Sequence, residues 1–365
     1  MLDERDGGPA PGRFPATAPR FGRYGSVGSA IRLLEPGTVY AVVQGTVDRA
    51  FAFAPNHDPA HPLLARGCPP EALDPASPIV PIPSVINIVG AAAARALALA
   101  PIDLHALELS SNHQHEAASA RDGDVAALPA FWRDFHSKVA RDLNRLRGRE
   151  GHLYAGPTRV TPCADDDAAL QQLVYALTNP VKDGLVDRVR RSPFFSTYRA
   201  QALGEPLRYF DIEWERWWAA GGPHNRRLHP KQFMVWRTLQ ITPLPRLAAM
   251  PAHERQALVR RAVAEVEAET AERFRREGRS FCPVTRHFAT DPRERPPAPR
   301  DSGRKPLVHA STRAGRDAYR EKVREVTRAY APASVAFRAG CHEVEFPPGT
   351  FRPPLTRPIA FADSS

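Results

Sequence analysis

The sequence is poor in cysteine, and this shortage excludes two classes of small folded domain. The 365 residues contain four cysteines, Cys68, Cys163, Cys282 and Cys341, and no two of them form a CxxC pair. Their wide spacing argues against a zinc ribbon and against a disulfide scaffold. It is consistent with a protein of a reducing compartment.

Long apolar segments are also absent. Residues 1–20 contain acids, prolines and glycines but no apolar stretch of the kind that a secretory signal needs. The alanine-rich run 88–100 is too short to span a bilayer and is interrupted by Arg95. We therefore expect a cytoplasmic protein with no membrane partner.

Positive charge and proline are abundant. Lysine and arginine number 50 against 40 acidic residues, the formal net charge is +10, and there are 38 prolines. An arginine excess of this size favours a polyanionic partner, most simply a nucleic acid. The alternative is a compositional bias, because a GC-rich coding sequence enriches Arg, Ala, Pro and Gly together.

Hydrophobic patterning predicts a mixture of helices and strands in the first 200 residues. Residues 38–53 are β-branched and aromatic and predict a strand that leads into a turn, while the proline-rich stretch 57–83 predicts a loop. Ser84 is placed to cap a helix over 85–99. Alternation over 102–109 predicts a strand with Ile102, Leu104 and Ala106 on one face and His105, Leu107 and Leu109 on the other.

Two further helices and a short strand follow in the same region. Residues 131–146 carry an apolar stripe at helical spacing, and 159–162 predict a short strand. The acidic run 165–167 predicts the start of a helix that ends near Asn179, because the residue before Pro180 is disfavoured in helical geometry.

The ends of the chain differ from this middle part. Residues 1–28 are rich in Gly, Pro and Arg and predict a disordered tail. Residues 221–346 predict a mainly helical, basic extension with helices over 253–276 and 312–330 and a Pro/Arg linker at 289–305. Residues 347–365 predict a proline-rich tail.

A first candidate motif lies in the segment SNHQH at 111–115. Side chains two positions apart in a strand point to the same side, so His113 and His115 would form a pair. Two imidazoles with open remaining positions suit a divalent ion that also holds a phosphate oxygen. The alternative is a polar strand end with two solvated histidines, since an HxH pair arises by chance about 0.5 times in such a chain.

A second candidate motif is the segment YALTNPV at 175–181. Tyr175 and Asn179 are four apart on a predicted helix and therefore share a face. A phenol is a poor nucleophile near neutral pH, but a nearby metal that polarises the target phosphate would lower the barrier to its attack. The side-chain oxygen of Asn179 is placed to be a third ligand of that metal. The alternative is a half-buried tyrosine and an ordinary helix end.

Taken together, these segments resemble the HUH single-tyrosine transposases, specifically the REP-associated tyrosine transposase-like branch. The resemblance rests on SNHQH at 111–115, VARDLNRLRGREGHLY at 139–154, DDDAALQQLVYALTNPVKDGLV at 165–186 and SPFFS at 192–196. It implies a catalytic domain over 29–220 with an α/β fold, a ferredoxin-like sandwich whose antiparallel sheet carries the histidine pair.

The resemblance also implies an activity. Tyr175 would attack single-stranded DNA near a hairpin and leave a 5′-phosphotyrosine, with His113, His115 and Asn179 holding Mg²⁺ or Mn²⁺. Arg141, Arg159 and Lys182 become candidates for contacts to the DNA backbone, the alternative for each being solvated surface. Relatives act as monomers or homodimers, and both states stay open.

Two residues of the first motif depart from the family pattern. Gln114 stands where the family usually has a bulky apolar residue, and Glu116 would place an acid beside the metal pair. A buried glutamine without partners would cost a few kcal/mol. These departures favour a second hypothesis, in which the protein is a catalytically impaired, domesticated relative that binds hairpin DNA or RNA without cutting it.

Overall fold

A computed structural model describes residues 31–56, 84–222, 224–225, 227–297 and 306–353. The predicted tail 1–28, the predicted loop 57–83, and parts of the predicted linker and C-terminal tail lie outside the described residues. The chain divides into two units, Met1–Ile31 and Arg32–Ser365, and the helices and strands described below belong to the second.

A four-stranded antiparallel sheet organises this unit. Its strands are β1 (Val39–Gly45), β2 (Asp103–Leu109), β3 (His113–Ser119) and β4 (Arg159–Pro162), in the order β2-β3-β1-β4. The predicted α/β character with an antiparallel sheet is confirmed, as is the short strand 159–162. β1 is shorter than the predicted extended segment 38–53, because the chain turns at Thr46.

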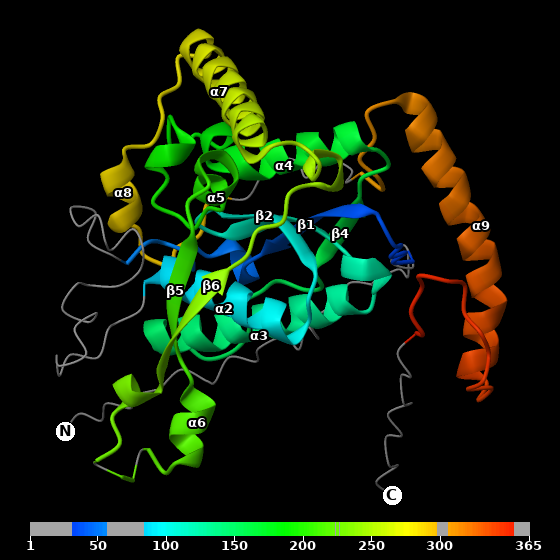
Figure 1. Ribbon diagram of the computed structural model, residues 1–365, viewed down its shortest axis with the longest axis horizontal. Helices are drawn as coiled ribbons and strands as arrows, with labels where there is room; N and C mark the ends of the chain where they lie inside the picture. Colours follow the sequence, from blue (N-terminus) through cyan, green and yellow to red (C-terminus); the bar gives the residue numbers. More distant parts are fainter. Residues whose placement is uncertain (1–30, 57–83, 223, 226, 298–305, 354–365) are drawn as a thin grey trace, which may run out of the picture. The chain divides into compact units, whose positions relative to one another are not determined.

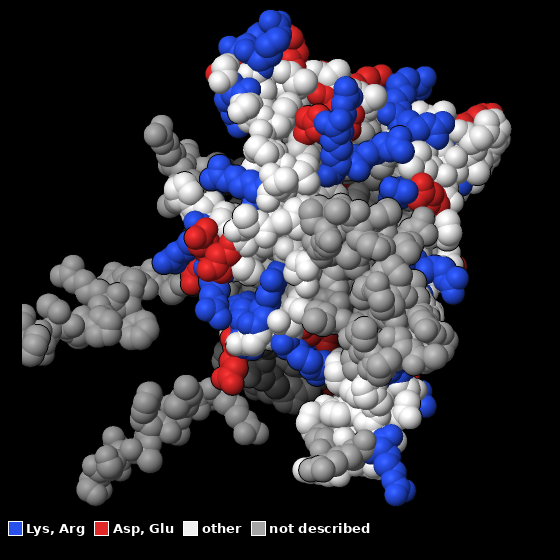
Figure 2. Space-filling view, turned by 90° about the vertical axis from the view of Figure 1, so that its left-hand side faces the viewer, with Lys and Arg blue, Asp and Glu red and all other residues white. Residues whose placement is uncertain are grey.

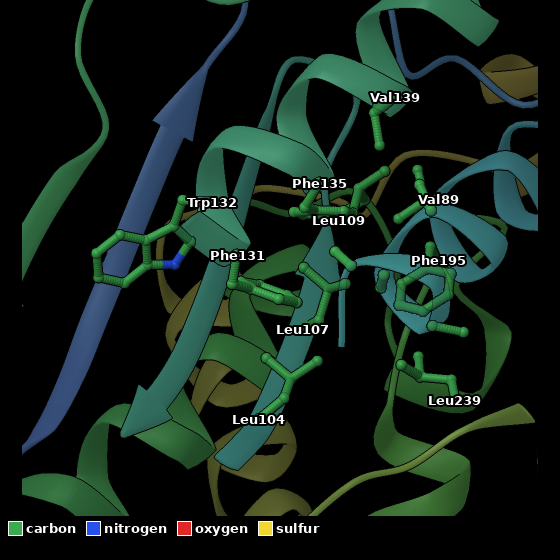
Figure 3. Close-up of a cluster of buried hydrophobic side chains, with 14 of the residues drawn as sticks. Val89, Leu104, Leu107, Leu109, Phe131, Trp132, Phe135, Val139, Phe195 and Leu239 are labelled. Carbon is green, nitrogen blue, oxygen red and sulfur yellow. The ribbon is translucent and has the colours of Figure 1, made fainter. Parts of the chain in front are cut away.

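Helices cover both faces of the sheet (Figure 1). α2 (Val85–Leu99) and α3 (Ala127–Arg147) share one buried cluster with Val42, Leu104 and Ala118 of the sheet. α4 (Asp166–Lys182) shares a second cluster with Val39, Ala106 and Ala117, which point the other way. Figure 3 shows the first cluster, with Phe131, Phe135 and Val139 of α3 near Leu104, Leu107 and Leu109 of β2. The sheet therefore has an α3 face and an α4 face.

The first two helices follow their sequence signals. α2 has the predicted bounds, and the Ser84 hydroxyl accepts a hydrogen bond from the Asn87 N–H at 3.1 Å. α3 begins before the predicted residue 131 and buries the predicted stripe at Phe131, Phe135 and Val139. It ends at Gly148, whose left-handed backbone (φ 57°) suits glycine.

The predicted alternation in β2 is wrong. The register between β2 and β3 shifts between Leu104 and Ala106, as in a β-bulge. Leu104 therefore shares the α3 face with Leu107 and Leu109, whereas Ala106 faces α4. After the shift the pairing is regular, so Glu108 shares the α4 face with Ala106.

The predicted end of α4 near Asn179 is also wrong. Asp165 caps the helix as the acidic run indicated, its carboxylate accepting from the Ala168 N–H at 2.8 Å. The helix continues through Pro180 to Lys182, and Asn179, Pro180 and Val181 are buried. Packing of this last turn against the sheet outweighs the local preference of the residue before proline, and Asn179 keeps its side chain free for contacts to β3.

The remaining elements extend the unit beyond the sheet. They are α5 (Tyr198–Leu203), β5 (Leu207–Ile212), α6 (Trp214–Ala219), β6 (Met234–Leu239), α7 (Ala252–Arg276), α8 (Val284–Phe288) and α9 (Arg313–Arg338), with short 3-10 turns η1 (Val47–Arg49), η3 (Arg121–Gly123), η4 (Val189–Arg191), η5 (Pro230–Phe233) and η6 (Pro245–Leu247). β5 and β6 pair as a separate antiparallel ribbon, and α7 packs on α4 and α5. The predicted helices 253–276 and 312–330 correspond to α7 and α9. Within the described residues, no helix is long and apolar enough to cross a membrane.

Candidate metal and nucleophile site

The candidate site lies on the α4 face of the sheet, where β3 begins. Glu108, His115, Val43 and Arg159 are successive partners across β2, β3, β1 and β4. Two residues along β3, His113 is paired with Gly45. Directly opposite residues of antiparallel strands point to the same face, so all of these positions face the same side as α4.

His113 is held by asparagines on two sides. Its Nδ1 lies 2.8 Å from Oδ1 of Asn112, and its Nε2 lies 3.1 Å from Oδ1 of Asn179. Burial is the main cause that lowers the pKa of His113 below 6.5, which favours the neutral ring. A neutral imidazole has a single N–H. When Nδ1 donates it to Asn112, Nε2 and the Asn179 oxygen face each other as two electron-pair donors.

His115 lacks a partner for one of its nitrogens. Its Nε2 is buried and forms no hydrogen bond among the described residues. Burial, with a smaller contribution from His113, lowers the pKa of His115 to about 3, so the ring is neutral at physiological pH. The two histidine rings meet edge to face with centroids 4.9 Å apart. A buried nitrogen lone pair without a donor suits a metal ion.

Tyr175 reaches the histidines from α4. Its ring lies edge to face with that of His115, with centroids 5.4 Å apart, and the residue is 38% exposed. The ammonium of Lys182, two turns along the same helix, lies 4.6 Å from the centroid of the Tyr175 ring. Burial, and then the negative charge of Asp183, raise the pKa of Tyr175 above 10, while Asn179 opposes them. The phenol is therefore protonated at rest.

Asn179 connects α4 to the strand end. It is 2% exposed, and its Oδ1 accepts a hydrogen bond from the Ser110 hydroxyl at 2.6 Å besides facing His113. Asp183, which follows α4, was not identified from the sequence as a site residue. Its Oδ2 lies 3.8 Å from Nε2 of His113. Only the exit geometry of α4 after Pro180 brings that carboxylate back to the strand.

The groups that could bind a divalent metal ion here are two histidine nitrogens and one amide oxygen. Among the described residues, no three side chains of His, Cys, Asp and Glu gather closely enough to hold a metal. His113, His115 and the Asn179 oxygen are the groups that converge here, and mixed nitrogen and oxygen ligands suit Mn²⁺ or Mg²⁺ with positions left for substrate.

Glu108 is a second residue that sequence reasoning missed. It is directly opposite His115, it is 0% exposed, and neither carboxylate oxygen has a partner in good hydrogen-bonding geometry in the described part of the chain. Burial raises its pKa well above 4.5, with only a partial offset from the Ser196 hydroxyl. Simple alternation puts Glu108 on the face of Ala106, but it does not show that this face meets the histidines, because that depends on the register between β2 and β3.

Gln114 and Glu116 lie on the α3 face and not beside the histidines, so the expected acid next to the metal pair is wrong. Strand alternation alone accounts for this, because residues 113 and 115 point to one face and 114 and 116 to the other. Gln114 donates from Nε2 to Oε1 of Glu116 at 2.6 Å and also approaches Nε2 of His136 at 2.8 Å.

Side chains of Tyr154, Trp132, His136 and Thr158 complete this polar network on the α3 face of β3. The Tyr154 hydroxyl donates to Oε1 of Gln114 at 3.0 Å, the Trp132 indole N–H donates to Oε2 of Glu116 at 3.1 Å, and Nδ1 of His136 lies 3.3 Å from the Thr158 hydroxyl. Each donor finds an acceptor. A satisfied buried network stiffens its surroundings, so the expected penalty of an unpartnered Gln114 does not arise.

The three predicted nucleic-acid contacts are placed differently. Lys182 lies over the Tyr175 ring, and Arg159 points to the α4 face in the same row as His115. Arg141 belongs to α3, on the opposite side of the sheet, and lies 3.6 Å from Glu215 of α6. The structure thus brings Lys182 and Arg159 to the face of the site and leaves Arg141 away from it.

Basic residues are distributed rather than gathered in one uninterrupted patch. Figure 2 shows lysines and arginines at several places on one side of the molecule, with acidic groups beside many of them. Many cations of the described residues form ion pairs, such as Arg191–Asp187 and Arg199–Glu205. Net charge alone therefore does not locate a nucleic-acid surface, and the unpaired cations near the site are more informative.

Among solved structures, the chain is similar to a REP-associated tyrosine transposase bound to a REP hairpin. The TM-score is 0.31 and the sequence identity 15%, over 47% of this chain and 82% of that one. No protein-family model and no curated protein matches the sequence. We therefore base the function on the geometry of the site.

Proposed function

We propose that this protein is a metal-dependent nuclease and strand transferase that cleaves single-stranded DNA through a 5′-phosphotyrosine at Tyr175. One observation carries the proposal. His113, His115, Tyr175 and Asn179 come from a strand and a helix far apart in the sequence. On the α4 face the two histidine rings contact each other, the Tyr175 ring contacts that of His115, and the Asn179 oxygen contacts His113. One of them, His115, has a buried ring nitrogen without a hydrogen-bond partner among the described residues.

The topology supports the ferredoxin-like arrangement expected for such a domain. β1, α2, β2, β3, α3 and β4 follow one another as βαββαβ, with the strand order β2-β3-β1-β4 and both helices on one face. This leaves the other face of the sheet to α4, which supplies the nucleophile. The predicted catalytic domain over 29–220 remains part of this proposal.

The proposed metal site consists of His113, His115 and Asn179. Mg²⁺ or Mn²⁺ bound there would polarise a non-bridging oxygen of the scissile phosphate. The protein's contribution is rigidity: Asn112 fixes the ring of His113, Ser110 fixes Asn179, and the network on the α3 face fixes β3. Ligands held in place in advance lose little entropy when the ion and the phosphate arrive.

The proposed chemical step is an in-line exchange at phosphorus. The phenol oxygen of Tyr175 forms a bond to phosphorus while the bond from phosphorus to the 3′ oxygen of the neighbouring nucleotide breaks. The phenol gives up its proton, and the 3′ oxygen gains one. The products are a 5′-phosphotyrosine and a free 3′-OH, and attack by a 3′-OH on the phosphotyrosine reverses the step and joins strands.

Lys182 and Arg159 are the proposed contacts to the DNA backbone on this face. The Lys182 ammonium lies 4.6 Å from the centroid of the Tyr175 ring, where it would help to balance the negative charge of a phosphate on Tyr175. Arg159 is two strands from His115 in the same row, roughly 10 Å away by strand spacing. A single strand that leaves the site along this row would pass it. Arg141 would contact DNA only on a different surface.

The test is a search for the covalent adduct. A pool of single-stranded hairpin DNAs with unpaired flanks is incubated with the protein and Mn²⁺, and the products are separated on a denaturing gel. We expect a protein–DNA band that requires the metal and that Tyr175→Phe abolishes. Tyr198→Phe is the matched control, because Tyr198 begins α5 and is not one of the site residues, and it should leave the band unchanged.

The second candidate function is a hairpin DNA- or RNA-binding protein without catalysis. Binding that persists while no adduct forms with any divalent metal would establish it and overturn the first proposal. The departures at Gln114 and Glu116 favoured this candidate in the sequence. Their satisfied contacts on the α3 face remove that reason, since the histidine pair rests on a well-packed strand.

A further inference from the structure

The strand beside His113 has an open position. Gly45 is the partner of His113 across β1 and β3, and a Cβ built on Gly45 would meet nothing closer than the Asn112 carbonyl oxygen at 4.0 Å. Its φ is not in the left-handed range, so the backbone does not require glycine there. A larger side chain would fit the strand but would fill the space next to the histidine.

The turn that follows β1 has a strained backbone. Asp48 and Arg49 are adjacent non-glycine residues with φ of 55° and 59°. Each left-handed residue of this kind costs about 1–2 kcal/mol. Sparsely populated backbone conformations persist where surrounding contacts determine them, and they are common at functional sites.

The contacts that hold this turn lead directly to the metal pair. The Asn112 side chain donates from Nδ2 to the Arg49 carbonyl at 3.1 Å while its Oδ1 contacts Nδ1 of His113 at 2.8 Å. The Thr46 hydroxyl donates to the Ala50 carbonyl at 2.7 Å, and the Thr46 N–H donates to the Asn112 carbonyl at 2.9 Å. Asn112 thus fixes the position of Arg49 relative to His113.

Arg49 is a cation without an anion. Its side chain is exposed, its Nη1 donates to the Pro297 carbonyl at 3.0 Å, and no carboxylate of the described residues lies within ion-pair distance of it. By contrast, Arg295 of the neighbouring segment reaches Asp48 at 4.0 Å. The positive charge of Arg49 acts on His113, where it adds to burial in lowering the pKa. An unpaired guanidinium next to neutral imidazoles favours an incoming phosphate.

We propose that the open space over Gly45, between His113 and the Asp48–Arg49 turn, seats a phosphodiester of the substrate strand, and that Arg49 binds its oxygens. This inference rests on the proposed function, because it assumes that single-stranded DNA enters the site. It adds a specific phosphate contact on the β1 side, opposite the α4 side from which Tyr175 and Lys182 approach. The strain of the turn then has a function, since the turn holds the Arg49 backbone one asparagine away from His113.

The experiment measures binding without cleavage. All variants carry Tyr175→Phe, and fluorescence anisotropy gives their affinity for a hairpin DNA from the adduct assay and for copies with one neutral methylphosphonate at each successive linkage. In the parent, which carries Tyr175→Phe and keeps Arg49, a methylphosphonate at the linkage that Arg49 contacts should weaken binding about 10-fold. In Arg49→Ala, binding to the unmodified DNA should fall by the same factor, and the methylphosphonate at that linkage should have no further effect.

Substitutions at Gly45 and Arg121 provide a second test and a control. Gly45→Val should keep Mn²⁺ binding and the thermal unfolding temperature but weaken DNA binding at least about 10-fold, because it fills the seat; Gly45→Ala is the milder version should valine disturb folding. Arg121→Ala is the matched arginine control, since Arg121 is already paired with Asp103 at 3.0 Å, and it should leave every affinity unchanged.

The outcomes separate this inference from the proposed function. DNA binding by the parent together with parental behaviour of Arg49→Ala and Gly45→Val at every linkage would overturn the inference alone. The inference would also be overturned if every linkage at which a methylphosphonate weakens binding by the parent still weakened binding by Arg49→Ala by the same factor. No DNA binding by the parent would overturn the inference and the proposed function together.

Discussion

Both faces of β3 carry buried polar residues, but their hydrogen-bonding groups have partners on one face and lack them on the other. On the α3 face, Gln114 and Glu116 are buried with their hydrogen-bonding groups matched to Trp132, His136 and Tyr154. On the α4 face, His115 has a buried nitrogen without a partner, and Glu108 opposite it has none for either oxygen. Unsatisfied buried polar groups cost stability, so they are retained where a ligand satisfies them. We therefore assign a structural role to the α3 side of β3 and expect chemistry on its α4 side. On the neighbouring strand, Oε1 of Gln44, which is opposite Gln114, also lacks a partner among the described residues.

The largest expected effect is the loss of activity when a histidine on the α4 face is removed. His115→Ala should reduce adduct formation with Mn²⁺ about 1,000-fold, roughly 4 kcal/mol of transition-state stabilisation, because it removes a metal ligand. The free energy of unfolding without metal should change by only about 1 kcal/mol, since the lost nitrogen had no partner. Quantification of the adduct on a gel measures the loss of activity, and urea unfolding measures the change in stability. A large loss of stability with full activity would reverse the roles assigned to the two faces.

The next largest effect is the loss of stability when the polar network on the α3 face is disrupted. Glu116→Ala should lower the free energy of unfolding by about 3 kcal/mol, because the Trp132 and Gln114 donors lose their buried acceptor. Mn²⁺ affinity per folded molecule, measured by calorimetry, should stay within about threefold. Trp132→Phe removes a single donor and serves as the graded control, with a loss of about 1 kcal/mol. Equal losses in both variants would argue against a connected network.

A pH series sharpens the contrast through Glu108. Its folded pKa is raised well above 4.5 by burial, so the folded state keeps a proton that the unfolded state releases. Stability should therefore fall as pH rises above about 4.5, by up to about 1.4 kcal/mol per unit until the folded pKa is reached, and should be unaffected by this group below that range. Glu108→Gln should flatten this decline in urea unfolding without metal. An unchanged slope would mean that Glu108 does not carry it.

The smallest effect compares single cations on the two sides of the sheet. Lys182→Ala should weaken binding of hairpin DNA about five-fold and reduce its salt dependence by close to one phosphate contact. Arg141→Ala, on the side of α3, should change both quantities by less than about twofold, because its guanidinium faces Glu215. Anisotropy titrations at several salt concentrations measure both. A larger effect for Arg141 would place DNA on the other surface.

Much of the scaffold could be predicted from local signals. The Ser84 cap and the bounds of α2, the Asp165 cap of α4 and the short strand β4 all follow from the residues themselves. These predictions succeeded because capping and strand propensity act over a few residues. Those that failed depend on distant packing: the bulge in β2 changes which side chains share a face, and burial of the turn after Asn179 carries α4 through Pro180.

The sequence by itself determined the residue types and their spacing: a histidine pair that a strand places on one side, and a tyrosine and an asparagine that a helix places on one face. Only the tertiary structure decided that these two pairs meet, that Glu108 lies opposite His115, and that Arg49 and Asp183 border the site. The physical reason is the range of the forces. Periodicity is local, whereas strand register, helix packing and the satisfaction of buried polar atoms arise from contacts between segments far apart in the chain.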